Sequence, residues 1–590
     1  MKKSNLKRFQ ELLINENIDL YLVPTSDYHN SEYIGDYFKT REYLTNFTGS
    51  AGTLLISKDN AYLFVDGRYF VQVEKEVNKE EITIMKIGQP GVPNISDFIA
   101  SYLHNNQTFA FDGKVINYNT IKVIKEKLCD KNITIISDID LVNKIWKDRP
   151  SLPLLPLFSI EEYAGCSALD KINKIKEEIT INKCDTHIIT SLDDIAYILN
   201  LRGHDIINNP VFLSYLIISN DKVILYINKE KLREDIISYL NVNNIEIKDY
   251  FAFYEDIKKL NNKNILLDSS VVNYLTYSLL SNNKIIDKPN PSSLMKCIKN
   301  DMEINNLRQC HILDGLAMLN TMIFIKNIKN YDEIFDEYEI GKIVDYNRSL
   351  QPYFIENSFN PIVAFKENAA IVHYSAKKDK CKKIKGNGLL LIDSGGQYYL
   401  GTTDITRTFV IGKVNKQVKR HFTLVLKAMF NLTNAKFIKG TSGTTLDAIA
   451  RNTLWNENLN YNHGTGHGVG YCLNVHEGPN NFRYNSPFNP QILEGMTTSN
   501  EPGLYIENSH GIRHENIILT IKDSNNEFGE FLKFETLTLC PFDLDGLDLS
   551  LLTKQDKKYI NEYHEYVYNK LSPYCDEEQL NYLNKFTRKI

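Results

Sequence analysis

The stretch "GLLLIDSGGQYYLGTTDITRTFVIG" (388–412) holds two aspartates where strands would otherwise stay apolar or end. Asp393 terminates an apolar run, and Asp404 follows 11 residues later, past the turn signal at Gly395 and Gly396. Two strand-like runs around a turn predict antiparallel strands that bring both carboxylates to one region. Carboxylates held together among apolar strands repel each other and lose hydration unless a cation offsets them. A single aspartate at a strand end is usually a turn residue, but the pair indicates a metal site.

Two glutamates lie further along the same part of the chain. Glu501 precedes a Pro-Gly turn in "NEPGLY" (500–505), and Glu515 lies in "GIRHENIILTI" (511–521), which predicts an apolar strand. Arg513 stands two residues before Glu515, so in one continuous strand both side chains share a face. Arg513 can clamp a substrate carboxylate with its bidentate fork. We favour the alternative, in which Arg513 is buried and paired with a ligand carboxylate such as Asp393.

The glycine-rich stretch "YNHGTGHGVG" (461–470) contains His463 and His467, four residues apart. A zinc-binding H-E-x-x-H helix is excluded, because Gly464 replaces the glutamate and each glycine costs a helix roughly 1 kcal/mol. The dinucleotide pattern G-x-G-x-x-G fails as well, at Val469. The stretch therefore predicts a loop or irregular strand whose glycines let the backbone approach a site closely.

These residues together form an oxygen-rich and mostly hard ligand set. Four carboxylates can offset two divalent cations and can bridge ions roughly 3.5 to 4 Å apart, as in two-metal hydrolases. Manganese fits these ligand types best, with cobalt and zinc as alternatives. The chemistry expected is attack by a metal-bridged hydroxide on a carbonyl or phosphoryl centre, and spacing alone leaves both open. The candidate metal ligands are Asp393, Asp404, His467, Glu501 and Glu515.

Length and composition predict a multidomain cytoplasmic protein. The chain has 590 residues, of which 43% are hydrophobic and 24% charged. Its formal net charge of −5 gives no electrostatic reason to expect nucleic acid or an anionic membrane as partner. Its nine cysteines form no C-x-x-C pair, which favours reduced thiols. No apolar run approaches the roughly 18 residues that would predict a membrane span.

Two proline-rich breaks, at 148–158 and 287–293, predict three domains: 1–150, 151–290 and 291–590. The first two alternate helix-like and strand-like runs in the same order, which predicts two similar α/β domains and an ancient duplication. The third begins with a long amphipathic helix that Asn300 and Glu303 cap, and then turns strand-like. Near its end, Tyr559, Tyr563 and Tyr566 share one helix face. Core packing is the favoured role of this stripe, and an oligomer interface is the alternative.

The strings "IDSGGQY", "GTTDITRTF", "HGTGHGVG", "NVHEGP", "EPGLY" and "GIRHEN" resemble those of the dinuclear-metal peptidases of the pita-bread fold. The chain is most similar to the aminopeptidase P (Xaa-Pro aminopeptidase) family in its long, three-domain cytosolic form. "SEYI", "GSAGT" and "DGRYF" resemble its first domain, and "NLRGHDIINNPVF" its second. The resemblance implies an α/β (α+β) protein in which two creatinase-like domains precede a pita-bread catalytic domain. It also implies removal of the N-terminal residue from peptides with proline in the second position, and a homodimer.

The same resemblance implies a role for each candidate ligand. Asp393 would bind one metal, Asp404 and Glu515 would bridge both, and His467 with Glu501 would hold the other. Glu501 would also act as general base toward the bridging water.

Three histidines would face the substrate on the family pattern, orienting the scissile carbonyl and moving protons. They are His373 in "IVHYS", His463 and His476 in "NVHEGP". Arg513 completes the candidate catalytic set.

The chain departs from the family pattern at two places. Asn500 stands where an acidic residue or threonine is expected, and His514 occupies a position that is usually apolar. The first puts fine geometry in doubt, and the second can alter the pH dependence. Two other functions remain as alternatives: a prolidase that cleaves Xaa-Pro dipeptides, and a non-catalytic binding module built on the same fold.

Overall fold

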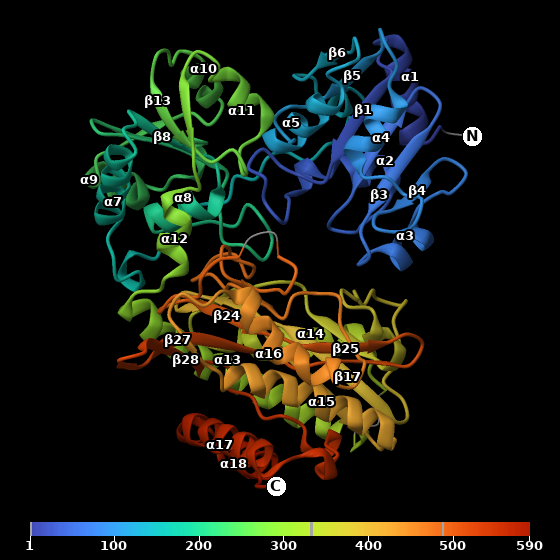
Figure 1. Cartoon of the computed structure of the whole chain (residues 1–590), viewed down its shortest axis with the longest axis vertical. Helices are drawn as coiled ribbons and strands as arrows, with labels where there is room; N and C mark the ends of the chain where they lie inside the picture. Colours follow the sequence, from blue (N-terminus) through green and yellow to red (C-terminus); the bar gives the residue numbers. More distant parts are fainter. Residues whose placement is uncertain (1–2, 331–333, 487–488) are drawn as a thin grey trace. The chain divides into compact units, whose positions relative to one another are not determined.

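The computed structural model describes residues 3–330, 334–486 and 489–590 (Figure 1). The chain forms two compact units. The first comprises residues 1–159, 167–207 and 211–292, and the second 160–166, 208–210 and 293–590. Helices and strands mix throughout both units, so the expected α/β class is confirmed. No helix in the described ranges combines the length and the apolar character that crossing a membrane requires.

The first unit contains two six-stranded sheets, of which the N-terminal one has the order β4-β3-β2-β1-β5-β6. Its central strand β1 alternates its side chains between two hydrophobic cores: Leu20 and Leu22 enter one, Tyr21 and Val23 the other. Both faces are therefore covered, as expected for a strand that is apolar throughout. The strands are β1 (Leu20–Pro24), β2 (Thr53–Ser57), β3 (Ala61–Val65), β4 (Thr83–Lys86), β5 (Thr108–Phe111) and β6 (Thr134–Ile136). The helices are α1 (Asn5–Asn15), α2 (Thr40–Thr45), α3 (Phe70–Glu76), α4 (Ile95–Tyr102), α5 (Tyr118–Lys127) and α6 (Val142–Ile145).

The second sheet, in green in Figure 1, repeats the first in topology. Its order is β12-β11-β10-β8-β13-β14. In both sheets the second and third strand pairs in this order are antiparallel and the other three pairs are parallel. The two N-terminal domains are therefore similar, as predicted, while the boundary near residue 150 stays a prediction because one unit holds both sheets. The strands of the second sheet are β8 (Thr186–Ile189), β10 (Ser214–Ser219), β11 (Val223–Ile227), β12 (Ile245–Lys248), β13 (Asn264–Leu267) and β14 (Lys284–Asp287). A separate antiparallel pair consists of β7 (Phe158–Ser159) and β9 (Leu201–Arg202). The helices are α7 (Ala168–Ile181), α8 (Leu192–Leu199), α9 (Glu234–Val242), α10 (Ala252–Lys258) and α11 (Tyr274–Leu279).

The second unit packs helices against several small antiparallel sheets. Helix α12 (Pro291–Cys297) leads into α13, where Asn300 and Glu303 form the predicted capping box. The other helices are α13 (Asp301–Asn327), α14 (Glu337–Ser349), α15 (Lys416–Thr433), α16 (Gly443–Trp455), α17 (Lys554–Leu571) and α18 (Glu577–Phe586). The sheets have the orders β15-β18-β19, β16-β17-β20 and β21-β28-β27-β24, with the pairs β22-β23 and β25-β26 beside them. The strands are β15 (Phe354–Asn357), β16 (Ile362–Phe365), β17 (Gly388–Ser394), β18 (Gly396–Tyr398), β19 (Gly401–Thr402), β20 (Ile405–Ile411), β21 (Lys436–Ile438), β22 (Gly466–His467), β23 (Asn481–Phe482), β24 (Thr497–Asn500), β25 (Gly503–Ile506), β26 (His510–Arg513), β27 (Asn516–Asn526) and β28 (Gly529–Thr536).

The antiparallel pairing predicted for residues 388–412 is present, with one difference. Strands β17 and β20 pair, and Asp393 lies opposite Thr406. The connection between them is not a simple turn, because it holds the small hairpin β18-β19, which joins β15 in another sheet. Gly395 makes this exit possible, since a Cβ atom there would lie 2.0 Å from the Thr403 carbonyl oxygen.

Candidate metal centre

Three of the five predicted ligands converge directly. One ligand atom each from Asp404, His467 and Glu515 lies within 4.8 Å of the others. His467 Nε2 also lies 3.3 Å from Glu501 Oε1 and 3.5 Å from Asp404 Oδ2. The fifth candidate, Asp393, is near enough that the charges of Asp404 and Glu501 both raise its pKa, after burial, the largest cause. The structure therefore brings all five candidates into one cluster.

Each candidate ligand lies at or next to a strand end. Asp393 belongs to β17, Asp404 directly precedes β20, His467 ends β22 and Glu501 follows β24. Glu515 lies between β26 and β27, so the expectation of one continuous strand through Arg513 and Glu515 is wrong. The chain changes partners at this point: β26 pairs with β25, whereas the Glu515 N–H donates to the Thr406 carbonyl of β20 at 3.1 Å. This change of partner interrupts the strand at the ligand itself.

The glycines around His467 allow close backbone contacts, as predicted. A Cβ atom on Gly466 would lie 1.8 Å from the Ser499 carbonyl oxygen, so only glycine fits there. His467 Nδ1 lies 2.9 Å from the Gly468 carbonyl, an arrangement in which Nδ1–H donates and Nε2 faces the carboxylates. The Ser499 hydroxyl accepts from the His467 main chain at 3.0 Å and donates to Glu501 at 3.1 Å. The loop thus fixes both His467 and Glu501.

The cluster carries more negative charge than the chain balances. Burial raises the pKa of Asp393 to about 6 despite the opposing charge of Arg513. Burial, then Asp404 and Glu501, raises the pKa of Glu515 well above its usual range. Among the described residues, Asp393 Oδ1 and Glu515 Oε1 are buried without a hydrogen-bond partner. Buried carboxylate oxygens left unsatisfied are costly, and two divalent cations would satisfy them, so the residues present fit a metal pair.

His467 and Glu501 form the exception within this cluster. Burial alone would lower the pKa of His467, but its contacts with Asp404 and Glu501 raise it well above the usual value. Burial would raise the pKa of Glu501, but the hydrogen bond and charge of His467 lower it to about 2. In the absence of metal, a protonated His467 balances the charge of one of the four carboxylates. A bound cation would take over this charge-balancing role.

Arg513 is buried against the cluster rather than open to a substrate. Its guanidinium donates to Asp393, to the Tyr505 hydroxyl at 2.7 Å and to Thr406 Oγ1 at 3.2 Å, and it is 2% exposed. The favoured interpretation, a second-layer partner of Asp393, matches these contacts. Tyr505 was missed by sequence reasoning, although the β25-β26 register places it diagonally from Arg513.

The three predicted substrate-facing histidines differ in their surroundings. His463 lies 2.9 Å from the Tyr505 hydroxyl through Nε2 and 2.7 Å from the Gly464 carbonyl through Nδ1, and burial lowers its pKa to about 4. The His476 ring packs edge-on against His467, with centroids 4.3 Å apart. His373 is exposed, in the irregular segment before β17. Substrate contact by each of them stays a prediction.

The two departures from the family pattern have structural roles. The Asn500 amide donates to the Met429 carbonyl at 2.8 Å and to Thr433 Oγ1 at 2.9 Å, which ties β24 to the end of α15. His514 is fully buried, and neither ring nitrogen has a hydrogen-bond partner in the described structure. Its ring packs edge-on against Phe422 at 4.4 Å, and burial lowers its pKa well below the usual value. His514 therefore fills apolar space as a neutral ring.

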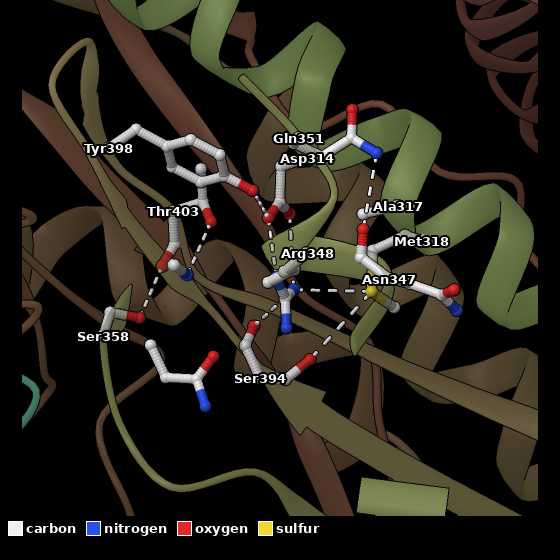
Figure 2. Close-up of polar contacts among 12 residues, drawn as sticks. Asp314, Ala317, Met318, Asn347, Arg348, Gln351, Ser358, Ser394, Tyr398 and Thr403 are labelled. Atoms are coloured by element: carbon white, nitrogen blue, oxygen red, sulfur yellow. Dashed lines mark hydrogen bonds and ion pairs between the residues drawn. The ribbon is translucent and has the colours of Figure 1, made fainter. Parts of the chain in front are cut away.

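A second buried polar network adjoins β17 (Figure 2), and no local sequence pattern indicated it. Arg348 of α14 donates through Nε to Asp314 Oδ1 of α13 at 2.7 Å, and its Nη2 reaches the Ser394 carbonyl at 3.3 Å. The Tyr398 hydroxyl donates to the same carboxylate at 3.0 Å. Ser394 directly follows Asp393, so this network supports the backbone that carries a predicted ligand.

Comparison with known proteins accounts for nearly the whole chain. Residues 5–145 and 148–303 each match a Creatinase/Prolidase N-terminal domain, residues 305–522 match Metallopeptidase family M24, and residues 530–590 match the C-terminal region of peptidase M24. A probable Xaa-Pro aminopeptidase P of Coprinopsis cinerea is 37% identical, over 99% of this chain and 98% of its own length. Another, of Talaromyces marneffei, is 38% identical, over 99% and 92%.

Solved structures agree with these matches. The X-prolyl aminopeptidase of Caenorhabditis elegans, described as a cytosolic enzyme with a di-nuclear active site, superimposes with a TM-score of 0.92 at 30% identity. That match covers 97% of this chain and 95% of the other. A prolidase of Pyrococcus horikoshii matches with a TM-score of 0.50 at 26% identity, covering 63% of this chain and 99% of its own. The fold extends well beyond the length of this prolidase.

Proposed function

Because the chain belongs to the Xaa-Pro aminopeptidase P family of M24 metallopeptidases, we propose that the cluster around Asp404, His467 and Glu515 is its catalytic centre. The protein is a metal-dependent Xaa-Pro aminopeptidase, a hydrolase that releases the N-terminal residue from peptides with proline in the second position. The observation that carries the site is the pair of buried, unpartnered carboxylate oxygens on Asp393 and Glu515.

Two divalent cations would be held by the five ligands together. Asp393 and the bridging pair Asp404 and Glu515 would hold one, and His467 and Glu501 with the same bridging pair would hold the other. Bound here, the cations would supply Lewis acidity toward the scissile carbonyl and an activated water. Manganese is the metal we propose, because four of the five ligands are hard carboxylates, and cobalt or zinc would be the substitutes.

The chain's own residues supply positioning and proton transfer. Glu501 is held by the Ser499 hydroxyl and lies beside His467, where its carboxylate can accept a proton from the attacking water. Arg513, buried against Asp393 and Tyr505, holds that carboxylate in place.

The histidines take different parts in this scheme. Arg513 donates to the Tyr505 hydroxyl, which leaves that hydroxyl free to donate to His463 Nε2. His463 is then a neutral ring with Nε2 accepting from Tyr505 and Nδ1 at the Gly464 carbonyl, so we assign it to orienting the substrate through contact with the ring itself. We therefore assign His476, in edge contact with His467, to stabilising the charge that develops on the carbonyl oxygen. His373 is assigned to the exposed rim of the same substrate site.

The bond that is cleaved limits how the site can recognise proline. The amide before proline has no donor hydrogen, so the site must recognise its shape instead of a hydrogen bond.

Domain division, assembly and location are further parts of the proposal. The division into 1–150, 151–290 and 291–590 is supported by the matched ranges 5–145, 148–303 and 305–522, of which the second extends past the proposed junction. A homodimer is proposed from the family resemblance. The cytoplasm is proposed because the nematode relative is described as cytosolic and the nine cysteines form no C-x-x-C pair.

The two other functions fit less well. A prolidase would not need the additional N-terminal sheet, and the Pyrococcus prolidase covers only 63% of this chain. A non-catalytic module would be expected to have lost ligands, whereas all five candidates converge here.

The test is cleavage of Arg-Pro-Pro and of an Xaa-Pro dipeptide by metal-stripped protein, with and without added manganese. We expect manganese-dependent release of arginine from the tripeptide and no cleavage of the dipeptide. Cleavage of the dipeptide alone would establish a prolidase. Manganese binding without cleavage of either peptide would contradict the proline specificity, and failure to bind manganese would contradict the metal site itself.

A further inference from the structure

The tyrosine stripe of α17 (Tyr559, Tyr563 and Tyr566) takes no part in the proposed reaction. Tyr563, however, is connected to the candidate metal centre by hydrogen bonds through Arg407. Tyr563 is 6% exposed, and its hydroxyl accepts from Arg407 Nη2 at 2.9 Å. The same hydroxyl can donate its one proton to either of two carbonyls, that of Thr538 at 3.0 Å or that of Cys540 at 2.9 Å. Tyr566 packs against the core, but its hydroxyl makes no hydrogen bond in the described structure.

Arg407 is a fully buried guanidinium with an unusual set of partners. No carboxylate side chain pairs with it within residues 3–330, 334–486 and 489–590. Its donors go to neutral oxygens instead, and its plane lies over the Phe542 ring at 3.9 Å. The acceptors are the Thr406, Glu515 and Cys540 carbonyls, Asn516 Oδ1 and the Tyr563 hydroxyl. A buried cation without a counter-ion depends on these hydrogen bonds for its position. Nη2 shares its two N–H groups among Asn516 Oδ1, the Cys540 carbonyl and the Tyr563 hydroxyl, so losing one of these acceptors weakens the set that fixes the guanidinium.

Arg407 holds the main chain of a predicted bridging ligand. Its Nη1 donates to the Glu515 carbonyl at 2.6 Å and to that of Thr406 at 2.9 Å. The Glu515 N–H donates back to Thr406 at 3.1 Å, and Thr406 Oγ1 donates to Glu515 Oε2 at 2.8 Å. The backbone and the carboxylate of Glu515 are thus both fixed against Thr406 and Arg407. Glu515 Oε1 remains without a hydrogen-bond partner in the described structure, and one carboxylate oxygen of Glu515 lies within 4.8 Å of ligand atoms of Asp404 and His467.

We propose that Tyr563 is a positioning residue for metal binding, which acts by fixing Arg407 and through it Glu515. This inference rests on the metal site proposed above and extends it to the C-terminal region, residues 530–590, which otherwise has no part in the reaction. Without the hydroxyl, the guanidinium loses one of its acceptors and its hold on Glu515 loosens. The expected result is weaker binding of the cation that Glu515 would bridge.

The test compares Tyr563→Phe with Tyr566→Phe in the full-length, metal-stripped protein. Each variant loses one hydroxyl from the same helix, but only the first removes a hydrogen bond. Calorimetric titration with manganese should show affinity lower by roughly 3- to 10-fold for Tyr563→Phe, near the lower end of what outer-shell changes cause. Its kcat on Arg-Pro-Pro should fall while KM changes less than about 2-fold, and Tyr566→Phe should match wild type in all three quantities.

A second variant, Arg407→Lys, tests the route of the effect. It keeps the charge but loses the planar fork, so manganese affinity should fall by roughly 10- to 100-fold. Adding Tyr563→Phe to Arg407→Lys should lower affinity less than about 2-fold further, because both act on one contact. Unchanged manganese affinity in Tyr563→Phe, or full additivity in the double variant, would overturn the proposal. If manganese affinity falls as expected but no proline peptide is cut, the positioning role stands and the substrate assignment fails.

Discussion

Two buried carboxylate systems with opposite electrostatics lie next to β17. In the first, Asp314 accepts from Arg348 and Tyr398, and although burial would raise its pKa, the charge and hydrogen bond of Arg348 lower it. In the second, Asp393 also accepts from an arginine, Arg513, yet burial raises its pKa to about 6. Each carboxylate has one arginine.

The difference lies in the neighbouring acids. One guanidinium balances the isolated Asp314, whereas Arg513 faces a cluster in which the charges of Asp404 and Glu501 add to the burial of Asp393. A buried pair that is internally balanced serves stability, and a buried excess of negative charge serves to bind a cation. Three measurements test whether the two carboxylate systems differ in this way.

The largest effect is expected from Asp404→Asn. The variant loses a residue that we propose as a bridging ligand, so manganese-dependent cleavage of Arg-Pro-Pro should fall by about 10³-fold or more. The metal-stripped variant should be at least as stable as wild type, because one of several mutually repelling charges is gone. Cleavage rates and the urea midpoint of metal-stripped protein measure the two effects. Retained proline-specific cleavage would contradict the bridging assignment.

A smaller effect, on stability instead of chemistry, is expected from Asp314→Asn. It leaves Arg348 buried without its counter-ion, which should lower the free energy of unfolding by about 3 to 5 kcal/mol. The control is Glu535→Gln, which removes the acid of the more exposed Arg308 pair and should cost about 1 kcal/mol or less. Urea denaturation of metal-stripped protein at pH 7 compares them. Equal losses would mean that the internal pair is no more important than a surface pair.

The smallest effect is a pH dependence that only the unbalanced side should show. Burial raises the pKa of Asp393 to about 6, above roughly 3.9 for an unfolded aspartate, so the native metal-stripped protein binds the extra proton between these values. Its stability should therefore fall as pH rises from about 4 through 6, by up to roughly 1.4 kcal/mol per pH unit. Arg348 lowers the pKa of Asp314 against the effect of burial. The contribution of Asp314 to the free energy of unfolding should therefore be lost only when the pH falls below this window.

Urea midpoints measured from pH 4.5 to 7.5 test this slope. Asp393→Asn should flatten the curve, and added manganese should do the same in wild type, because it binds the deprotonated ligands. Parallel curves for wild type and Asp393→Asn would show that Asp393 does not titrate in this range.

Local patterns predicted the parts of the molecule that local forces determine. The capping box at Asn300, the antiparallel pairing of β17 with β20 and the irregular backbone at 461–470 all follow from residues close together in sequence. The similarity of the two N-terminal domains was visible in the order of apolar runs, and both sheets have the same topology. The convergence of the acidic residues was predicted because several carboxylates in apolar strands are costly unless a common cation offsets their charge.

Long-range contacts determined what the sequence could not predict. The hairpin β18-β19 inserts because its strands pair with β15, and the break at Glu515 arises because its N–H pairs with β20. Tyr505 gains its role only through the register of β25 with β26. Arg407 did carry a signal, since a charged residue in the run "DITRTFVIG" needs a buried partner, but that partner lies over 150 residues later in α17.

The contact between α17 and Arg407 also bears on when the enzyme can mature in the cell. The N-terminal sheets are complete by residue 292, so they can fold while the rest of the chain is still being synthesised. Tyr563 is added about fifty residues after Glu515, which at roughly 5 to 20 residues per second is a delay of several seconds. During that interval all five proposed metal ligands have been synthesised, but Tyr563, which we propose fixes Glu515 through Arg407, has not. Tight metal loading is therefore expected only after the last helices have left the ribosome.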